Sequence, residues 1–153
     1  MLQRIQAMKH ESRAAIPDSP RCSPPSSAAG PANQQATLLD GVYRTSFTRG
    51  ELADSPLLYD ADEINDRNWG DFTLTFDRGR VTFAQRNDVD SYSTSGTYTL
   101  NGKAITLNFT EGGNAGETFA VRWSLYRDVL TFERESLGTI PTPWLVKPWP
   151  RAG

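Results

Sequence analysis

Apolar and polar residues alternate along most of the chain after residue 40, which is the pattern of strands that bury one face. In residues 70–76, for example, Phe72, Leu74 and Phe76 fall on one face and the residues between them are polar. A short closing strand is predicted at residues 144–147, and the prolines on both sides confine it to a brief or edge position. The other predicted strands are residues 42–48, 70–76, 80–86, 95–100, 104–109, 118–125 and 129–134.

Short turns separate these strands. Asp77-Arg78-Gly79 predicts a tight hairpin turn in which Gly79 takes a positive φ, and Asn101-Gly102 is the strongest two-residue hairpin signal in the chain. Consecutive hairpins favour an up-and-down barrel over a Greek-key sandwich, and closure of a barrel removes exposed strand edges. We therefore predict an all-β fold, a barrel of about eight antiparallel strands.

Each predicted strand has one face that points into the barrel. We expect the following residues on that inward face: Tyr43, Thr45, Phe47, Phe72, Leu74, Phe76, Val81, Phe83, Tyr98, Leu100, Ile105, Leu107, Phe109, Phe119, Val121, Trp123, Leu125, Leu130 and Phe132.

The segment between the first two predicted strands, residues 49–69, breaks the alternation. It contains Gly50, Pro56 and a cluster of charged residues, and it fits two short helical turns over residues 49–53 and 60–65. Long connections with structure of their own are often functional. We expect this insertion to lie over one mouth of the barrel.

Residues 1–36 differ from the rest in composition. They hold five of the ten prolines and none of the aromatic residues. Such a tract buries too little apolar surface to offset its ordering entropy, so we expect a disordered tail over 1–36 and a barrel domain over 37–153. Charged residues interrupt the start of the chain, which favours an unstructured extension over an export or transit peptide.

Composition excludes several functions. The net charge of −2 argues against non-specific nucleic-acid binding, and the chain has no apolar run long enough for a transmembrane helix. The single cysteine, Cys22, and the single histidine, His10, allow neither an internal disulfide nor a Cys/His zinc site. Catalysis by a Ser-His-Asp or Cys-His arrangement has no base within the predicted barrel. No catalytic residue, metal or cofactor is predicted.

Aromatic residues carry the strongest functional signal. An eight-stranded barrel is wide enough either to be filled by side chains or to hold one small ligand, and both outcomes stay open for a domain with this many rings. If a cavity exists, tyrosine hydroxyls would orient the ligand. The predicted ligand-lining residues are Tyr43, Phe47, Phe72, Leu74, Phe83, Tyr98, Phe109 and Trp123.

The order of these segments resembles a known family. Leu39-Asp40-Gly41-Val42-Tyr43-Arg44, the helical insertion, residues 70–76 and 95–100, Trp123-Ser124-Leu125 and Lys147-Pro148-Trp149-Pro150-Arg151 are together similar to a lipocalin-like (calycin-type) barrel. The resemblance is to the C-terminal domain of some bacterial transporter solute-binding proteins, and it covers residues 38–151. It implies a barrel, a small ligand and an extracytoplasmic setting. Only the Pro-rich tail stands before the barrel in this sequence, so we expect either the detached terminal part of such a protein or a stand-alone relative.

The resemblance also implies a contact that closes the barrel. In that superfamily a basic residue from the last strand packs over an aromatic ring of the first. Arg151 or Lys147 would take this role against Tyr43 or Trp149, as a cation–π contact that is structural rather than functional.

The leading prediction is non-catalytic binding of a small hydrophobic or aromatic molecule inside the barrel, as an accessory module of a solute-binding system. One alternative is a small-barrel enzyme of isomerase, cyclase or dehydratase type that uses a tyrosine and a carboxylate. That enzyme would need an inward Asp or Glu beside Tyr43 or Tyr98. The other alternative is a structural or interaction domain whose interior is fully packed.

Overall fold

The structure, a computed structural model, describes residues 36–134 and 140–153. The elements below all belong to the unit formed by residues 33–153. Apart from Ala36, the tail predicted over residues 1–36 lies outside the described residues.

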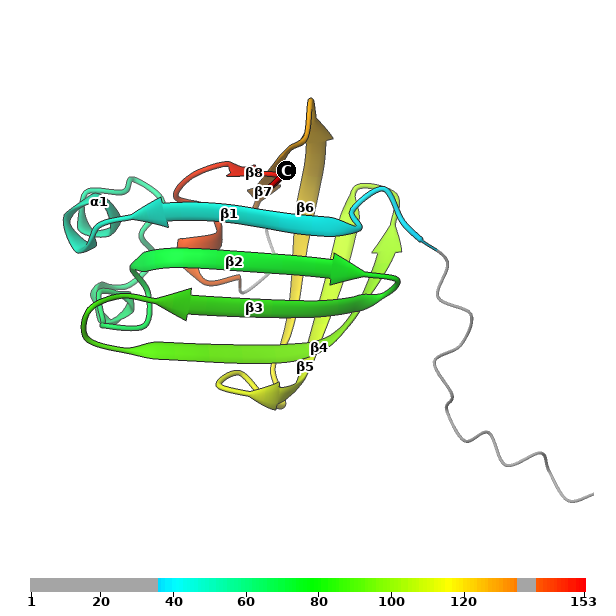
Figure 1. Cartoon of the computed structure of the whole chain (residues 1–153). Coiled ribbons are helices and arrows are strands. Elements are labelled where there is room, and N and C mark those ends of the chain that lie inside the picture. Colours follow the sequence, from blue (N-terminus) through cyan, green and yellow to red (C-terminus); the bar gives the residue numbers. More distant parts are fainter. Residues whose placement is uncertain (1–35, 135–139) are drawn as a thin grey trace, which may run out of the picture. The chain divides into compact units, whose positions relative to one another are not determined.

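Eight strands form one antiparallel sheet in which every strand pairs with its neighbours in sequence, in the order β1 to β8. The sheet curves into a nearly closed barrel (Figure 1), which confirms the predicted all-β up-and-down architecture. The strands are β1 (Gly41–Phe47), β2 (Gly70–Asp77), β3 (Arg80–Arg86), β4 (Ser91–Asn101), β5 (Ala104–Gly112), β6 (Thr118–Tyr126), β7 (Val129–Glu133) and β8 (Trp149–Pro150).

The predicted turns explain the register of two hairpins. Asp77 pairs with Arg80, so Arg78 and Gly79 form a two-residue loop in which both have positive φ, 46° and 84°. Such values match the twist of the flanking strands. In the second hairpin Asn101 pairs with Ala104, so the loop is Gly102-Lys103, one residue later than the Asn-Gly signal suggests.

The connection between β1 and β2 contains the two helical turns expected there. The helix α1 (Arg49–Ala53) begins with a capping box in which Thr48 and Glu51 satisfy each other's backbone N–H groups. A single 3-10 turn, η1 (Ala61–Glu63), follows, capped by the Asp60 side chain.

The closing strand predicted at residues 144–147 is wrong. That stretch contains the end of a 3-10 turn, η2 (Thr142–Trp144), and β8 follows at Trp149–Pro150. Pro143 explains the difference, because its fixed φ suits the first turn of a helix and it has no N–H for a strand ladder. The prolines on both sides of Trp149 then keep β8 to two residues.

Closure of the barrel depends on a short contact between β1 and the residues after β8. Tyr43 and Arg151 form an isolated antiparallel bridge, and the Ala152 N–H donates to the Val42 carbonyl at 2.7 Å. On its other side Arg151 donates its N–H to the Asp128 carbonyl, also at 2.7 Å.

The inward face is largely as predicted, with four exceptions. Leu100 is 36% exposed, because β3 begins opposite Thr97 and the end of β4 therefore extends past its neighbour. Thr45, Trp123 and Leu125 are only partly buried. The remaining inward predictions are buried: Tyr43, Phe47, Phe72, Leu74, Phe76, Val81, Phe83, Tyr98, Ile105, Leu107, Phe109, Phe119, Val121, Leu130 and Phe132.

Candidate functional site

Two tryptophans from the C-terminal segment, residues 140–150, occupy the interior of the barrel. Trp144 and Trp149 are at most 1% exposed, and their ring centroids lie 5.9 Å apart. Trp144 stacks on Phe83 at 4.7 Å with an interplanar angle of 16°, and it meets Phe132 edge-on at 5.5 Å. The Trp149 indole N–H donates to the Trp144 carbonyl at 3.1 Å, so the segment is hydrogen-bonded to itself inside the barrel.

The predicted ligand-lining residues belong to the same aromatic cluster. The structure brings seven of the eight together as buried core: Tyr43, Phe47, Phe72, Leu74, Phe83, Tyr98 and Phe109. Trp123 differs, because it is partly exposed and Lys103 Nζ lies 5.6 Å from its ring centroid. These residues pack against one another and against the two tryptophans, and their contact with a ligand stays a prediction.

A pocket of about 220 Å³ lies at one end of the barrel, above Trp144. We call it the mouth pocket. Its walls come from five separate parts of the chain, namely the β1–β2 connection, β3, the start of β4, the β5–β6 connection and the C-terminal segment. The lining residues are Glu63, Asn68, Phe83, Tyr92, Asn114, Glu117, Pro141, Pro143 and Trp144.

Tyr92, near the start of β4, forms one wall of the mouth pocket. It lies opposite Gln85 in the β3–β4 register, and its ring centroid is 5.9 Å from that of Phe83. A Cβ at Gly113 would come within 2.8 Å of the Tyr92 ring, so only glycine lets the two approach. Arg67 lies over the ring at 5.8 Å. Burial raises the pKa of Tyr92 to about 12, although Arg67 opposes the shift.

A hydrogen-bonded contact ties the C-terminal segment to the β1–β2 connection beside this pocket. The Thr142 N–H donates to Glu63 Oε1 at 3.1 Å, and the Thr142 hydroxyl makes a short hydrogen bond to Glu63 Oε2. The same hydroxyl lies 3.2 Å from the Leu57 carbonyl. Thr142 is completely buried, so these contacts fix the segment that carries Trp144.

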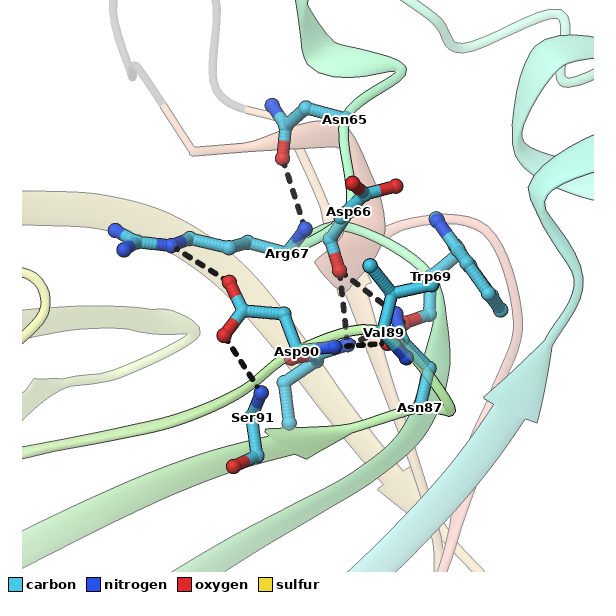
Figure 2. A network of polar contacts seen from close by, with 9 residues as sticks. Asn65, Asp66, Arg67, Trp69, Asn87, Val89, Asp90 and Ser91 are labelled. Carbon is cyan, nitrogen blue, oxygen red and sulfur yellow. Dashed lines mark hydrogen bonds and ion pairs between the residues drawn. The ribbon is translucent and has the colours of Figure 1, made fainter.

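A second polar network holds the loops at the same end (Figure 2). Asn87 Nδ2 donates to the carbonyls of Asp66 and Trp69, at 2.7 and 3.1 Å. Gln85 Nε2 also donates to the Trp69 carbonyl, at 2.5 Å. The Arg67 Nε pairs with Asp90 at 3.2 Å, which connects the β1–β2 connection to the β3–β4 turn.

This network leaves two buried polar atoms unsatisfied. Within residues 36–134 and 140–153, Gln85 Oε1 and Trp69 Nε1 have no hydrogen-bond partner. Gln85 itself is only 2% exposed. Buried polar groups are almost always paired, so an acceptor and a donor left over beside a pocket need an explanation.

The opposite end of the barrel shows the predicted cation–π contact. Arg151 lies over Tyr43, with its guanidinium carbon 5.2 Å from the ring centroid, which confirms one of the pairings expected for a lipocalin-like barrel. Lys147 has another role, because its Nζ pairs with Glu51 Oε1 at 2.7 Å. Glu51 lies at the surface, and the hydrogen bond from Lys147 lowers the pKa of its carboxyl group.

A tyrosine and a carboxylate do meet at this end. The Tyr98 hydroxyl donates to Asp40 Oδ1 at 3.0 Å, and the Arg78 N–H donates to the same oxygen at 3.1 Å. Burial raises the pKa of Tyr98 to about 12. Burial opposes ionisation of Asp40, but the hydrogen bonds from Tyr98, Arg78 and Thr37 outweigh it and lower the pKa of Asp40. The pair therefore holds a protonated phenol against a carboxylate at neutral pH, as a fixed hydrogen bond of the turn before β1.

The sequence does not point to Tyr92, Asn114 or Glu117 as site residues. The predicted strand begins at residue 95, whereas β4 begins at Ser91, so Tyr92 falls outside the predicted strand. The Gly112-Gly113 pair was the available signal, because glycines at the end of a strand often mark a close approach by another group.

The described residues contain no group of three or more His, Cys, Asp or Glu side chains that could hold a metal ion. None of the helices in the described part of the chain has the length and apolar character needed to cross a bilayer. Comparisons with family models, curated proteins and solved structures give no match. The fold is consistent with a lipocalin-like barrel on its strand order and closure.

Proposed function

We propose that the domain binds a small aromatic molecule in the mouth pocket, without catalysis. One observation carries this proposal, namely a pocket with aromatic walls and a polar rim. Phe83, Tyr92 and Trp144 supply the walls, and side chains from two loops supply the rim. Ligand sites in proteins combine apolar walls with a few placed polar groups in this way.

The size of the pocket limits the ligand. Its volume of about 220 Å³ lies below the roughly 300–1,000 Å³ typical of sites for drug-sized molecules. A single aromatic ring with a short substituent matches that volume.

The proposal places the ligand above Trp144 rather than at the barrel centre. Trp144 and Trp149 already occupy the interior, so a ligand at the barrel centre would have to displace an indole. Of the predicted lining residues, Phe83 is the one that lines the mouth pocket. The resemblance to the terminal domain of bacterial solute-binding proteins adds a further proposal, that the site serves as an accessory to solute capture.

The experiment is a titration of the full chain with a single-ring aromatic compound, phenethyl alcohol, followed by quenching of tryptophan fluorescence. We expect saturable quenching that is lost in Tyr92→Leu. Tyr126→Leu is the matched control, because Tyr126 is 68% exposed at the end of β6 and lies outside the pocket. Quenching that does not saturate, or that both variants keep, would contradict the proposal.

A structural or interaction role is the second candidate, and the filling of the interior by Trp144 and Trp149 favours it. Absence of saturable binding for every aromatic probe would support this role. The enzyme alternative requires a tyrosine beside a carboxylate, and Tyr98 and Asp40 form such a pair. Neither residue lines the mouth pocket. A variant Tyr98→Phe that leaves probe binding unchanged would separate this contact from the ligand site.

A further inference from the structure

The charged groups that the mouth pocket offers to a ligand are hydrogen-bond acceptors. Glu63 and Glu117 bring carboxylates to its lining. Asn68 Nδ2 donates one of its two hydrogens to the Glu63 carbonyl at 2.9 Å, which leaves its side-chain oxygen and one N–H. A ligand that pairs with the two carboxylates must therefore bring donors.

The charge of the lining favours a cation. The pocket is lined by two acidic side chains and by no basic one. Two guanidinium groups lie next to it, and both are engaged. Arg67 pairs with Asp90, and Arg134 lies 5.4 Å over the ring of Tyr59 with its Nη2 directed at the Leu57 carbonyl.

In the part of the chain that the structure describes, two unpaired polar atoms lie buried at the same end of the barrel, the acceptor Gln85 Oε1 and the donor Trp69 Nε1. Gln85 lies on the inward face of β3, two residues after Phe83, and pairs in register with Tyr92. Two carbonyls, of Asp66 and Trp69, face its amide nitrogen, which fixes the orientation of the carboxamide. Among the described residues no donor reaches its oxygen. This end of the barrel thus combines two carboxylates and the faces of aromatic rings with an unpaired amide oxygen and an unpaired indole N–H.

We propose that the ligand of the mouth pocket is an aromatic amine that carries a positive charge. The ring packs against Tyr92 and Trp144, and the ammonium group lies toward Glu63 and Glu117. Aromatic faces attract cations through their quadrupole, so the walls and the rim favour the same group. This inference rests on the proposed function, because it assigns a ligand class to the same pocket.

The experiment compares three compounds with the same ring and chain length on the full protein: phenethylamine, phenethyl alcohol and phenylacetate. Affinities come from isothermal titration, and the indole N–H signals in NMR report whether Trp144 is affected. We expect phenethylamine to bind about tenfold more tightly than the alcohol, and phenylacetate to bind most weakly.

Two charge-matched variants locate the effect. Glu117 is exposed, and Glu117→Gln should lower the affinity for phenethylamine about threefold while leaving that for the alcohol unchanged. Asp77→Asn is the control, because Asp77 is exposed at the far end of β2 and the variant makes the same change in net charge. It should leave all three affinities unchanged.

The outcomes separate the two proposals. Equal affinities for the amine and the alcohol, or tighter binding of phenylacetate, would overturn the inference and leave the mouth pocket as a site. An equal loss of amine affinity in Glu117→Gln and Asp77→Asn would overturn it as well. Absence of saturable binding for all three compounds would overturn both the inference and the proposed function.

Discussion

The guanidinium of Arg151 covers the ring of Tyr43, and its Nη2 donates to the Tyr43 hydroxyl at 2.8 Å. The same group donates to the carbonyls of Asp40 and Leu38, at 2.9 and 3.0 Å. Tyr43 belongs to the first strand and Arg151 follows the last. Because β8 has only two residues, the Arg151 side chain supplies several of the hydrogen bonds that join the two ends of the sheet.

Substitution of that side chain tests its role in closure. Arg151→Lys should lower the free energy of unfolding by about 2 kcal/mol, because an ammonium group cannot reproduce the planar fork that reaches Tyr43 and two carbonyls at once. Tyr43→Phe removes only the hydroxyl and should cost about 1 kcal/mol. Urea denaturation measures both. A lysine variant as stable as the parent protein would show that the backbone bridge alone closes the barrel.

Trp144 should be a major source of stability. Trp144→Ala removes a buried indole that stacks on Phe83, and we expect a loss of about 3–5 kcal/mol in the free energy of unfolding. Trp123→Ala serves as the comparison, because Trp123 is only partly buried and its loss should cost clearly less. Thermal unfolding followed by circular dichroism ranks the two variants. The reverse order would mean that the C-terminal segment is not part of the core.

Two glycines should respond differently to the same substitution. A Cβ at Gly96 would lie 1.9 Å from the Asn108 carbonyl oxygen, at the irregularity in the β4–β5 register, so Gly96→Ala should cost about 3 kcal/mol. Gly102 has φ +59° and open space around it, so Gly102→Ala should cost about 1–2 kcal/mol from backbone strain alone. Chemical denaturation of both variants provides the comparison, and similar losses would argue against the close approach at Gly96.

Alkaline pH should destabilise the domain through two tyrosines. Burial raises the pKa of Tyr92 and of Tyr98 from 10.0 to about 12. The unfolded chain loses these protons at lower pH than the folded protein does, so stability is fully present below pH 10 and falls as the pH rises towards 12.

The measurement is the unfolding midpoint in urea across that pH range. Tyr98→Phe and Tyr92→Phe should each flatten the fall, whereas Tyr126→Phe, which changes an exposed ring, should not. A profile that is unchanged in both buried variants would assign the alkaline loss to other groups.

The period of two along the chain was sufficient to predict the barrel, its strand order and most of its inward face, since each strand buries one side. The alternation fails to predict burial where tertiary packing or turn chemistry determines it. Leu100 has the right parity but lies past the end of β3, and Trp144 is buried from a 3-10 turn rather than a strand.

The mouth pocket was harder to predict than the fold. Its residues are distant in sequence, as Glu63, Asn114 and Trp144 show, and the loops that carry them have no periodic pattern. Only the closing contact of Arg151 on Tyr43 came from the family resemblance, because that contact depends on fold closure rather than on local spacing.

The meander order has a consequence for kinetics. Among the described residues every strand pairing is between neighbours in sequence except the bridge of Tyr43 to Arg151, which spans the domain. Local hairpins form quickly and long-range contacts form late, so we expect this bridge to be unformed in the transition state for folding. A variant that weakens this bridge should unfold faster and refold at a nearly unchanged rate. The contact that forms last would then determine the lifetime of the native barrel.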